Sequence, residues 1–110
     1  MGLSKSEKFT DAQNNIAKLA KGLGHPARIA ILEYIFTQDS CVCGDIVDEI
    51  GLAQATISQH LKELKKLGLI QGTISGTKVC YCINQEHWSA LKATLSQFLD
   101  MDLKKTTSCC

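Results

Sequence analysis

The sequence predicts a mainly α-helical domain with a single β-hairpin, in the order α-α-α-α-β-β-α. Three observations support this fold class. Apolar residues recur at helical spacing near both ends, a short and a longer helical segment flank a tight turn, and two strand-like runs flank a glycine. The length of 110 residues suits one domain. We expect that domain to span residues 1–102, followed by a flexible tail, residues 103–110, that contains two cysteines.

Two helices are predicted in the first third of the chain. The first covers residues 5–21, because Ser4 and Glu7 form an S-x-x-E capping box in front of an apolar stripe. The second covers residues 26–37, begins at the only proline and is apolar on several faces, so we expect it to be central. The stripe of the first helix consists of Phe9, Ala12, Ile16, Leu19 and Leu23.

A short helix, a glycine turn and a longer helix come next. The short helix is predicted over residues 44–50 and ends at Gly51, and the longer one covers residues 54–67 and ends at Gly68. The longer helix has an apolar edge, which we expect to be buried, and an opposite polar edge. The apolar edge holds Ile57, Leu61 and Leu64, and the polar edge holds Gln54, Ser58 and Lys62.

A hairpin and a last helix complete the order. Strands are predicted over residues 69–74 and 78–83, joined by a Ser-Gly-Thr turn, and the last helix covers residues 85–100 after the cap residue Asn84. A short helix, a tight turn, a longer helix and a hairpin form a winged helix-turn-helix. The last helix carries a second apolar stripe, formed by Trp88, Leu91, Leu95 and Phe98.

The apolar stripes of the first and last helices have two interpretations. Either the two helices pack on each other within the chain, or they form the seam of a dimer. Two such stripes at opposite ends of a small domain favour the dimer, so we expect a homodimer.

The distribution of charge indicates a DNA-binding surface. The chain carries 12 Lys and Arg against 11 Asp and Glu, so any basic face must be local. Residues 44–53 hold three acidic groups and no basic one, whereas residues 54–78 hold four basic groups and one acidic group. We predict that base edges of double-stranded DNA are contacted by Gln54, Ala55, Thr56, Ser58 and Gln59, and phosphates by Lys62 and Lys78.

Other functional classes have less support. A winged helix that binds protein instead would show no steep salt dependence of DNA affinity. A disulfide oxidoreductase would need C-x-x-C at a helix start beside parallel strands, so we predict that the chain is not an enzyme. His60, between the two edges of the longer helix, is interpreted as a packed or backbone-bonded histidine. Since no secretory signal or membrane span is recognisable, we expect a cytoplasmic protein without a membrane partner.

The six cysteines are arranged in pairs. In a reducing compartment, clustered thiols bind metal or sense redox state more often than they form structural disulfides. In the second predicted strand, two cysteines share the face opposite the one that we expect to meet the core. They are therefore either exposed bystanders or a second, separate thiol site. The three pairs are Cys41 and Cys43, Cys80 and Cys82, and Cys109 and Cys110.

Three stretches resemble the ArsR/SmtB family of bacterial metal-sensing repressors. Residues 23–32 (LGHPARIAIL) resemble the signature of the family's second helix, and residues 54–64 (QATISQHLKEL) resemble its recognition helix. Residues 68–83, with GLI, a glycine and VCYCI, resemble its wing. The resemblance covers about residues 7–100. It implies a homodimer built from the first and last helices, bound to an inverted repeat of DNA and released when a ligand binds.

The pair Cys41 and Cys43 resembles the C-x-C sensing site of the arsenite and cadmium/lead branches of this family. The resemblance therefore implies trivalent arsenic or antimony as inducer. There are two departures from the pattern. A glycine separates Cys43 from Asp45, and Val47 stands where a third cysteine is expected.

The remaining ligands of the ion stay open. Trivalent arsenic takes three sulfurs, and zinc or cadmium takes four ligands, whereas the C-x-C pair supplies two. Cys109 and Cys110 are candidates for the rest, because the extended tail would span up to about 30 Å. The alternatives to arsenic are cadmium, lead or zinc. A further alternative is oxidation or persulfide formation at the thiols, with no metal involved.

Overall fold

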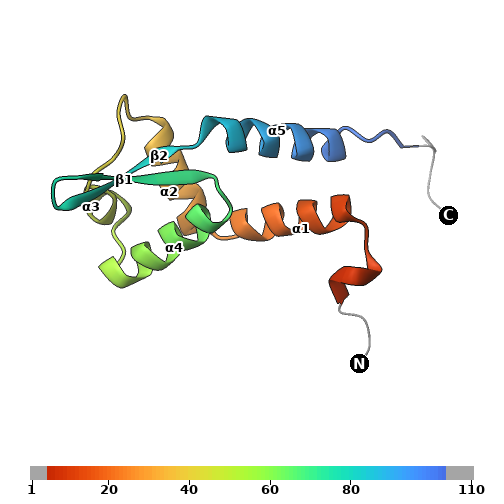
Figure 1. The fold of residues 1–110 in the computed structure, drawn as a ribbon, viewed down its shortest axis with the longest axis horizontal. Helices are drawn as coiled ribbons and strands as arrows, with labels where there is room; N and C mark the ends of the chain where they lie inside the picture. The colour runs from red at the N-terminus through yellow and green to blue at the C-terminus, as the bar shows by residue number, and fades with distance from the viewer. Residues whose placement is uncertain (1–4, 104–110) are drawn as a thin grey trace.

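The structure is a computed structural model that describes residues 5–103. It confirms the predicted order of four helices, a hairpin and a last helix (Figure 1). A 3-10 turn, η1, precedes these elements. The bounds are η1 Lys5–Lys8, α1 Asp11–Leu23, α2 Pro26–Phe36, α3 Ile46–Ile50, α4 Gln54–Lys66, β1 Ile70–Ser75, β2 Lys78–Ile83 and α5 Gln85–Leu99.

The first α-helix begins later than the sequence predicted. Thr10 is its cap, and its hydroxyl accepts a hydrogen bond from the backbone nitrogen of Gln13 at 3.1 Å. The side chain of Gln13 in turn accepts from the backbone nitrogen of Thr10 at 2.9 Å. This T-x-x-Q capping box lies closer to the apolar stripe than the predicted Ser4 box, and it sets the start of α1. Ser4 lies outside the described residues.

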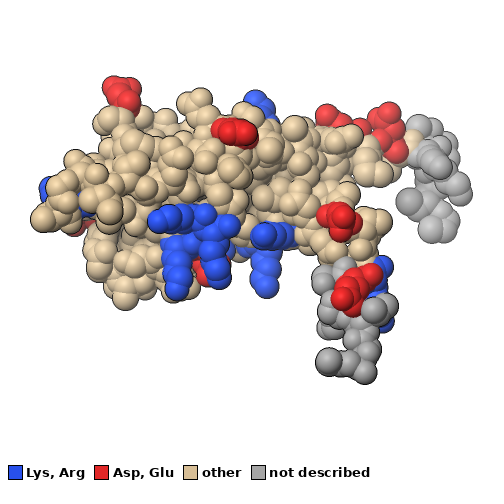
Figure 2. Space-filling view, in the orientation of Figure 1, with Lys and Arg blue, Asp and Glu red and all other residues tan. Residues whose placement is uncertain are grey.

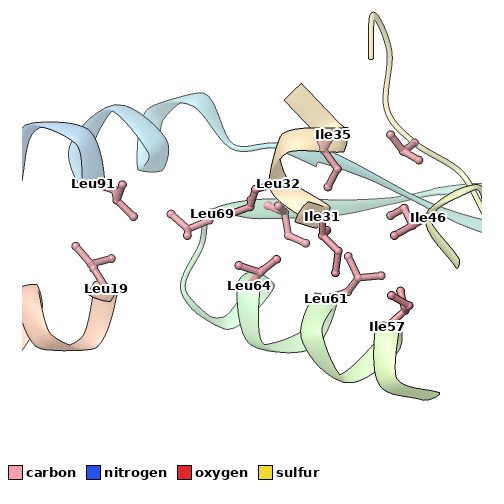
Figure 3. Packing of buried hydrophobic residues seen from close by; sticks show 12 residues of the cluster. Leu19, Ile31, Leu32, Ile35, Ile46, Ile57, Leu61, Leu64, Leu69 and Leu91 are labelled. Carbon is pink, nitrogen blue, oxygen red and sulfur yellow. The ribbon is translucent and has the colours of Figure 1, made fainter. Parts of the chain in front are cut away.

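The core lies where α2 and α4 meet beneath the hairpin. Ile31 is fully buried at the centre of α2, and Leu64 is fully buried on α4. In Figure 3 the buried side chains of α4 point toward those of α2, with Leu69 beside them. The apolar edge predicted for α4 is confirmed, because Ile57, Leu61 and Leu64 are all buried.

The turn between α3 and α4 depends on a glycine. Gly51 ends α3 with φ of 79° and ψ of 25°, a left-handed conformation that costs other residues free energy. Its backbone nitrogen donates to the carbonyl of Val47 at 2.9 Å. Because only Leu52 and Ala53 follow before α4 begins, the position of α3 constrains the position of α4.

The hairpin is antiparallel, with Ile70 opposite Ile83 and Ser75 opposite Lys78. Its second strand also pairs on the other edge, where Val42 and Tyr81 exchange two backbone hydrogen bonds of 2.9 and 2.8 Å. The segment before α3 is therefore joined to the wing by a single antiparallel β-bridge. The sequence did not predict this pairing.

The terminal helices α1 and α5 lie side by side at the end of the molecule opposite the wing (Figure 1). Leu19 on α1 and Leu91 on α5 are buried in the shared core. Farther along, α5 leaves Phe98 and Leu99 exposed, and Met101 beyond it is 71% exposed. Within residues 5–103, no helix has the length and apolar character needed to cross a membrane.

Candidate DNA-binding face and thiol cluster

One face of α4 presents polar side chains to solvent. Ile57 and Leu61 anchor the opposite edge of the helix in the core, so this polar face points away from the domain. On it, Gln54 donates a hydrogen bond to the hydroxyl of Ser58 at 3.2 Å, which links two predicted base contacts. All seven residues predicted to contact DNA are exposed: Gln54, Ala55, Thr56, Ser58, Gln59, Lys62 and Lys78.

The basic surface is larger than the sequence predicted. Figure 2 shows Lys and Arg gathered along one side of the molecule, over the segments labelled α4 and α1 in Figure 1. Between these helices lies a cavity of about 350 Å³. Sequence reasoning missed the contribution of α1, although lysines spaced three apart on its polar side were a signal. The basic residues that line the cavity are Lys18, Lys21, Arg28 and Lys66.

A histidine and an arginine connect the start of α2 to α4. His60 is 7% exposed, and the Nε of Arg28 donates to its Nδ1 at 3.2 Å. The rings of His60 and His25 lie 4.4 Å apart between centroids. Burial lowers the pKa of His60 below the ordinary value of 6.5, and the nearby His25 and Arg28 lower it further. His60 is therefore a packed, neutral residue, bonded to a side chain.

Four cysteines come together where the segment before α3 meets β2. The structure joins Cys41 to Cys82 and Cys43 to Cys80 as disulfides, with Cα–Cα distances of 4.6 and 4.1 Å. The first and second C-x-C pairs therefore form one cluster and not two separate sites. In each segment the cysteines are two residues apart, so their side chains leave the same face of the strand.

The wing cysteines lie on the face of β2 opposite Tyr81 and Ile83, which pack against the core cluster as the alternation predicted, but neither cysteine is exposed. Cys80 is 3% exposed, whereas Val79, which alternation places on the opposite face, is 45% exposed. The reason is the Val42 pairing, because it brings the segment before α3 against the cysteine face of β2. Tyr81 does pack against the core cluster, so β2 is covered on both faces. Cys109 and Cys110 lie outside the described residues.

The chemistry of this cluster depends on whether its sulfurs are bonded. With the sulfurs joined in pairs, residues 5–103 contain no group of three or more His, Cys, Asp and Glu side chains that could hold a metal ion. Reduction would free four thiols, two from the segment before α3 and two from β2. Together they are a donor set suited to thiophilic ions. A cavity of about 270 Å³ opens beside Cys41 and Cys82.

Comparisons with known proteins agree with this fold. Residues 25–71 match the model of a family described as bacterial regulatory protein, arsR family. The HTH-type transcriptional regulator YgaV of Escherichia coli K12 is 32% identical over 79 residues, which cover 72% of this chain and 80% of YgaV. The HTH-type transcriptional repressor SmtB of Mycobacterium tuberculosis is 37% identical over 70 residues. That match covers 64% of this chain and spans about half of SmtB, 51%.

A solved structure has a similar fold. It is the solution structure of a homodimeric winged helix-turn-helix DNA-binding domain from Mycobacterium bovis. The two share 20% identity with a TM-score of 0.63, and the match covers 99% of each chain. The described chain therefore has the winged helix-turn-helix fold, and it belongs to the arsR family of bacterial regulatory proteins.

Proposed function

We propose that the chain is a homodimeric transcriptional repressor that binds an inverted repeat in duplex DNA and is released by trivalent arsenic or antimony. The inducer binds thiolates that include Cys41 and Cys43. One observation carries the proposal: these cysteines lie directly before α3, which contacts α4, the helix with the DNA-facing polar side chains. A ligand that moves the segment before α3 therefore acts on α4 through a short connection.

DNA binding is supported by the two surfaces of α4. The polar side chains near its start suit base edges in the major groove. The basic face formed by α4 and α1 suits the phosphates on either side of that groove. Lys78 at the tip of the wing adds a further cation at the far end of the motif.

Dimerisation is supported by apolar surface at the ends of α1 and α5. Phe98 and Met101 are 49% and 71% exposed, and both line a cavity of about 460 Å³ between α5 and α1 that Ile16 also borders. Exposed apolar surface of this kind is typical of interaction sites. A second copy would cover it, in agreement with the homodimer reported for the Mycobacterium bovis domain. In a dimer, two copies of α4 read two half-sites.

The inducer is proposed from the sulfur chemistry. Arsenic in the trivalent state takes three thiolates, and Cys41 and Cys43 supply two of them. The neighbouring Cys80 and Cys82 supply the third, because β2 holds them against the same segment. The tail cysteines, Cys109 and Cys110, are the alternative source. The same four thiols would also suit tetrahedral cadmium or zinc.

The test measures DNA affinity with and without the inducer. A duplex selected by the reduced protein from a random library is labelled, and its fluorescence anisotropy is followed while arsenite, antimonite, cadmium or zinc is added. We expect arsenite to weaken DNA binding by about 5–150-fold. The double substitution Cys41→Ser and Cys43→Ser should abolish this response, whereas Cys109→Ser and Cys110→Ser should leave it intact. Unchanged affinity in the presence of arsenite would contradict the proposed inducer.

A further inference from the structure

We propose that Cys41, Cys43, Cys80 and Cys82 form one reversible redox centre, in which two disulfides across the strand pair tie the wing to the segment before α3. This modification site rests on the proposed function only where it concerns arsenic. It adds a second signal, an oxidant, and assigns a role to the wing cysteines. The argument depends on the strand register, the burial of the sulfurs and their access to solvent.

The register places the cysteines where cross-strand side chains approach most closely. Val42 and Tyr81 exchange both backbone hydrogen bonds, so they are a hydrogen-bonded pair of the antiparallel ladder. The residues on either side are therefore non-hydrogen-bonded pairs, whose Cα atoms lie about 4.5 Å apart in general. Here the pair Cys41 and Cys82 is separated by 4.6 Å and the pair Cys43 and Cys80 by 4.1 Å. The first separation lies at the short end of the usual range for a disulfide, and the second lies slightly below that range.

The same register excludes the other pairings across the strands. Cys43 and Cys82 are diagonal neighbours, and so are Cys41 and Cys80, because each of these pairs is offset by two residues from the directly opposite position. Diagonal partners in an antiparallel pair are about 7–8 Å apart, whereas a disulfide needs Cβ atoms about 3.5–4.5 Å apart. Oxidation of the folded chain is therefore directed to one connectivity.

The two disulfides differ in their access to solvent. Cys41 is exposed and borders the cavity of about 270 Å³, together with its half-buried partner Cys82. Cys80 is buried and its partner Cys43 is half-buried. An oxidant or a reductant in solution therefore reaches the outer pair, Cys41 and Cys82, before the inner pair. An exposed disulfide is reduced more easily than a buried one, which suits a bond that forms and breaks in a reducing compartment.

The reaction balances with a peroxide as oxidant. The thiolate of Cys41 attacks hydrogen peroxide, which forms a sulfenic acid and releases one water after proton uptake. The thiol of Cys82 then attacks that sulfur, the S–S bond forms and a second water leaves. As each disulfide forms, its two thiols thus pass two electrons and two hydrogens to one peroxide. A dithiol in solution reverses the change by thiol–disulfide exchange.

Oxidation and arsenic compete for the same sulfur atoms. A sulfur in a disulfide is no longer a thiolate, so it is no longer available to trivalent arsenic. Since arsenic in the proposed function uses Cys41 and Cys43, the oxidised protein should lose its response to arsenite. The cell's redox state would then decide whether the repressor can sense the metalloid.

The link between the two segments is tested first, in the full chain carrying Cys109→Ser and Cys110→Ser, which removes exchange with the tail. Reduced protein is treated with hydrogen peroxide, free thiols are alkylated, and tryptic peptides are mapped by mass spectrometry without reduction. We expect a cross-link between the peptides of residues 29–62 and 79–92, reversible with dithiothreitol. Absence of this cross-link in folded, oxidised protein would overturn the proposal.

Matched double substitutions sharpen the test. Cys41→Ser with Cys82→Ser, or Cys43→Ser with Cys80→Ser, removes one native pair and should leave the cross-link of the other. Cys41→Ser with Cys80→Ser keeps only the diagonal Cys43 and Cys82 and should lose the cross-link. Equal cross-linking in matched and mismatched variants would show that the register does not direct the reaction, which contradicts the proposal.

The arsenite response separates this proposal from the proposed function. Anisotropy with DNA is repeated on reduced and peroxide-treated protein, and the response to arsenite should disappear on oxidation. If reduced protein ignores arsenite but the mapped cross-links form, the proposed inducer fails and the redox centre stands. If reduced protein responds to arsenite and the response survives complete cross-linking, the proposed competition between oxidation and arsenic for the same sulfur atoms is contradicted.

Discussion

The α4 helix and the segment of residues 41–43 reach the core by different means. Four side chains anchor α4, namely Ile57, His60, Leu61 and Leu64, and each is at most 7% exposed. The 41–43 segment has one buried apolar side chain, Val42, and is otherwise held by two backbone hydrogen bonds and two sulfur pairs. The helix proposed to face DNA is thus fixed by packing, whereas the segment before α3 is held largely by disulfide bonds, which a reductant can break. Four predictions test this contrast.

The largest effect is expected from the packed side of α4. Leu64 is fully buried, so Leu64→Ala should lower the free energy of unfolding by about 2–5 kcal/mol through lost burial and a cavity. Urea unfolding followed by circular dichroism measures this. The control is Thr56→Ala on the exposed face of the same helix, which should stay within about 0.5 kcal/mol. Equal losses in both variants would show that α4 is not anchored by this edge.

A comparable or smaller effect is expected from the sulfur pairs. Cys41 and Cys82 are 41 residues apart, and a disulfide closing a loop of this size stabilises by about 2–4 kcal/mol. The second pair lies inside the first loop and should add little. Urea unfolding of peroxide-treated protein, with and without a reductant, measures the difference. A reduced protein as stable as the oxidised one would show that the hydrogen bonds and Val42 alone hold the segment.

Substitutions on the polar side of α4, which we propose faces DNA, should change DNA affinity and not stability. Lys62→Ala should weaken binding several-fold on every sequence and reduce the slope of log affinity against log salt by about 0.9. The unfolding free energy should change little, because Lys62 is exposed. Lys92→Ala, an exposed lysine on α5 away from the basic face, is the control and should leave both quantities unchanged. A loss with Lys92→Ala of equal size would contradict the assigned face.

The smallest effect concerns the pH dependence of the α2–α4 contact. Because the pKa of His60 is lowered in the folded protein, chiefly by burial, the unfolded chain binds the proton more readily. The free energy of unfolding therefore contains a contribution from His60 that is fully present above about pH 6.5. This contribution is lost as the pH falls from there toward the lowered pKa of the folded protein, by at most about 1.4 kcal/mol per pH unit. His60→Gln should flatten thermal stability in that window. An unchanged slope would show that other groups dominate.

The regular elements were predictable because their signals are local. The spacing of Ile57, Leu61 and Leu64 is enough to predict which edge of α4 is buried. Gly51 predicts the end of α3 without any knowledge of the tertiary structure. The predicted start of α1 was wrong because the sequence offers two capping boxes, one at Ser4 and one at Thr10. The helix begins at the Thr10 box, which lies closer to the apolar stripe. A local pattern thus predicts that a helix or strand exists more reliably than it predicts the residue at which that element begins.

The thiol cluster was not predictable from local pattern. A segment of three residues has no periodicity to recognise, and Tyr81, the bridge partner of Val42, lies 39 positions away along the chain. The face of Cys80 was assigned from the alternation of side chains alone. Alternation shows that a strand has two faces, but it does not show that the segment of residues 41–43 covers one of them. The equal C-x-C spacing in the two segments was the available signal, since matching spacings fit an antiparallel pair. The contribution of α1 to the basic face is likewise a contact between distant segments.

The pairing of Val42 with Tyr81 also bears on solubility. A two-stranded hairpin has two open edges, and an open edge is a template on which another chain can add a strand and begin to aggregate. The short 41–43 segment occupies the outer edge of β2 at its middle, where Tyr81 would otherwise offer a free N–H and a free C=O. Loosening this segment would expose that edge. Conditions that free the segment should therefore also make the protein more prone to self-association through its wing.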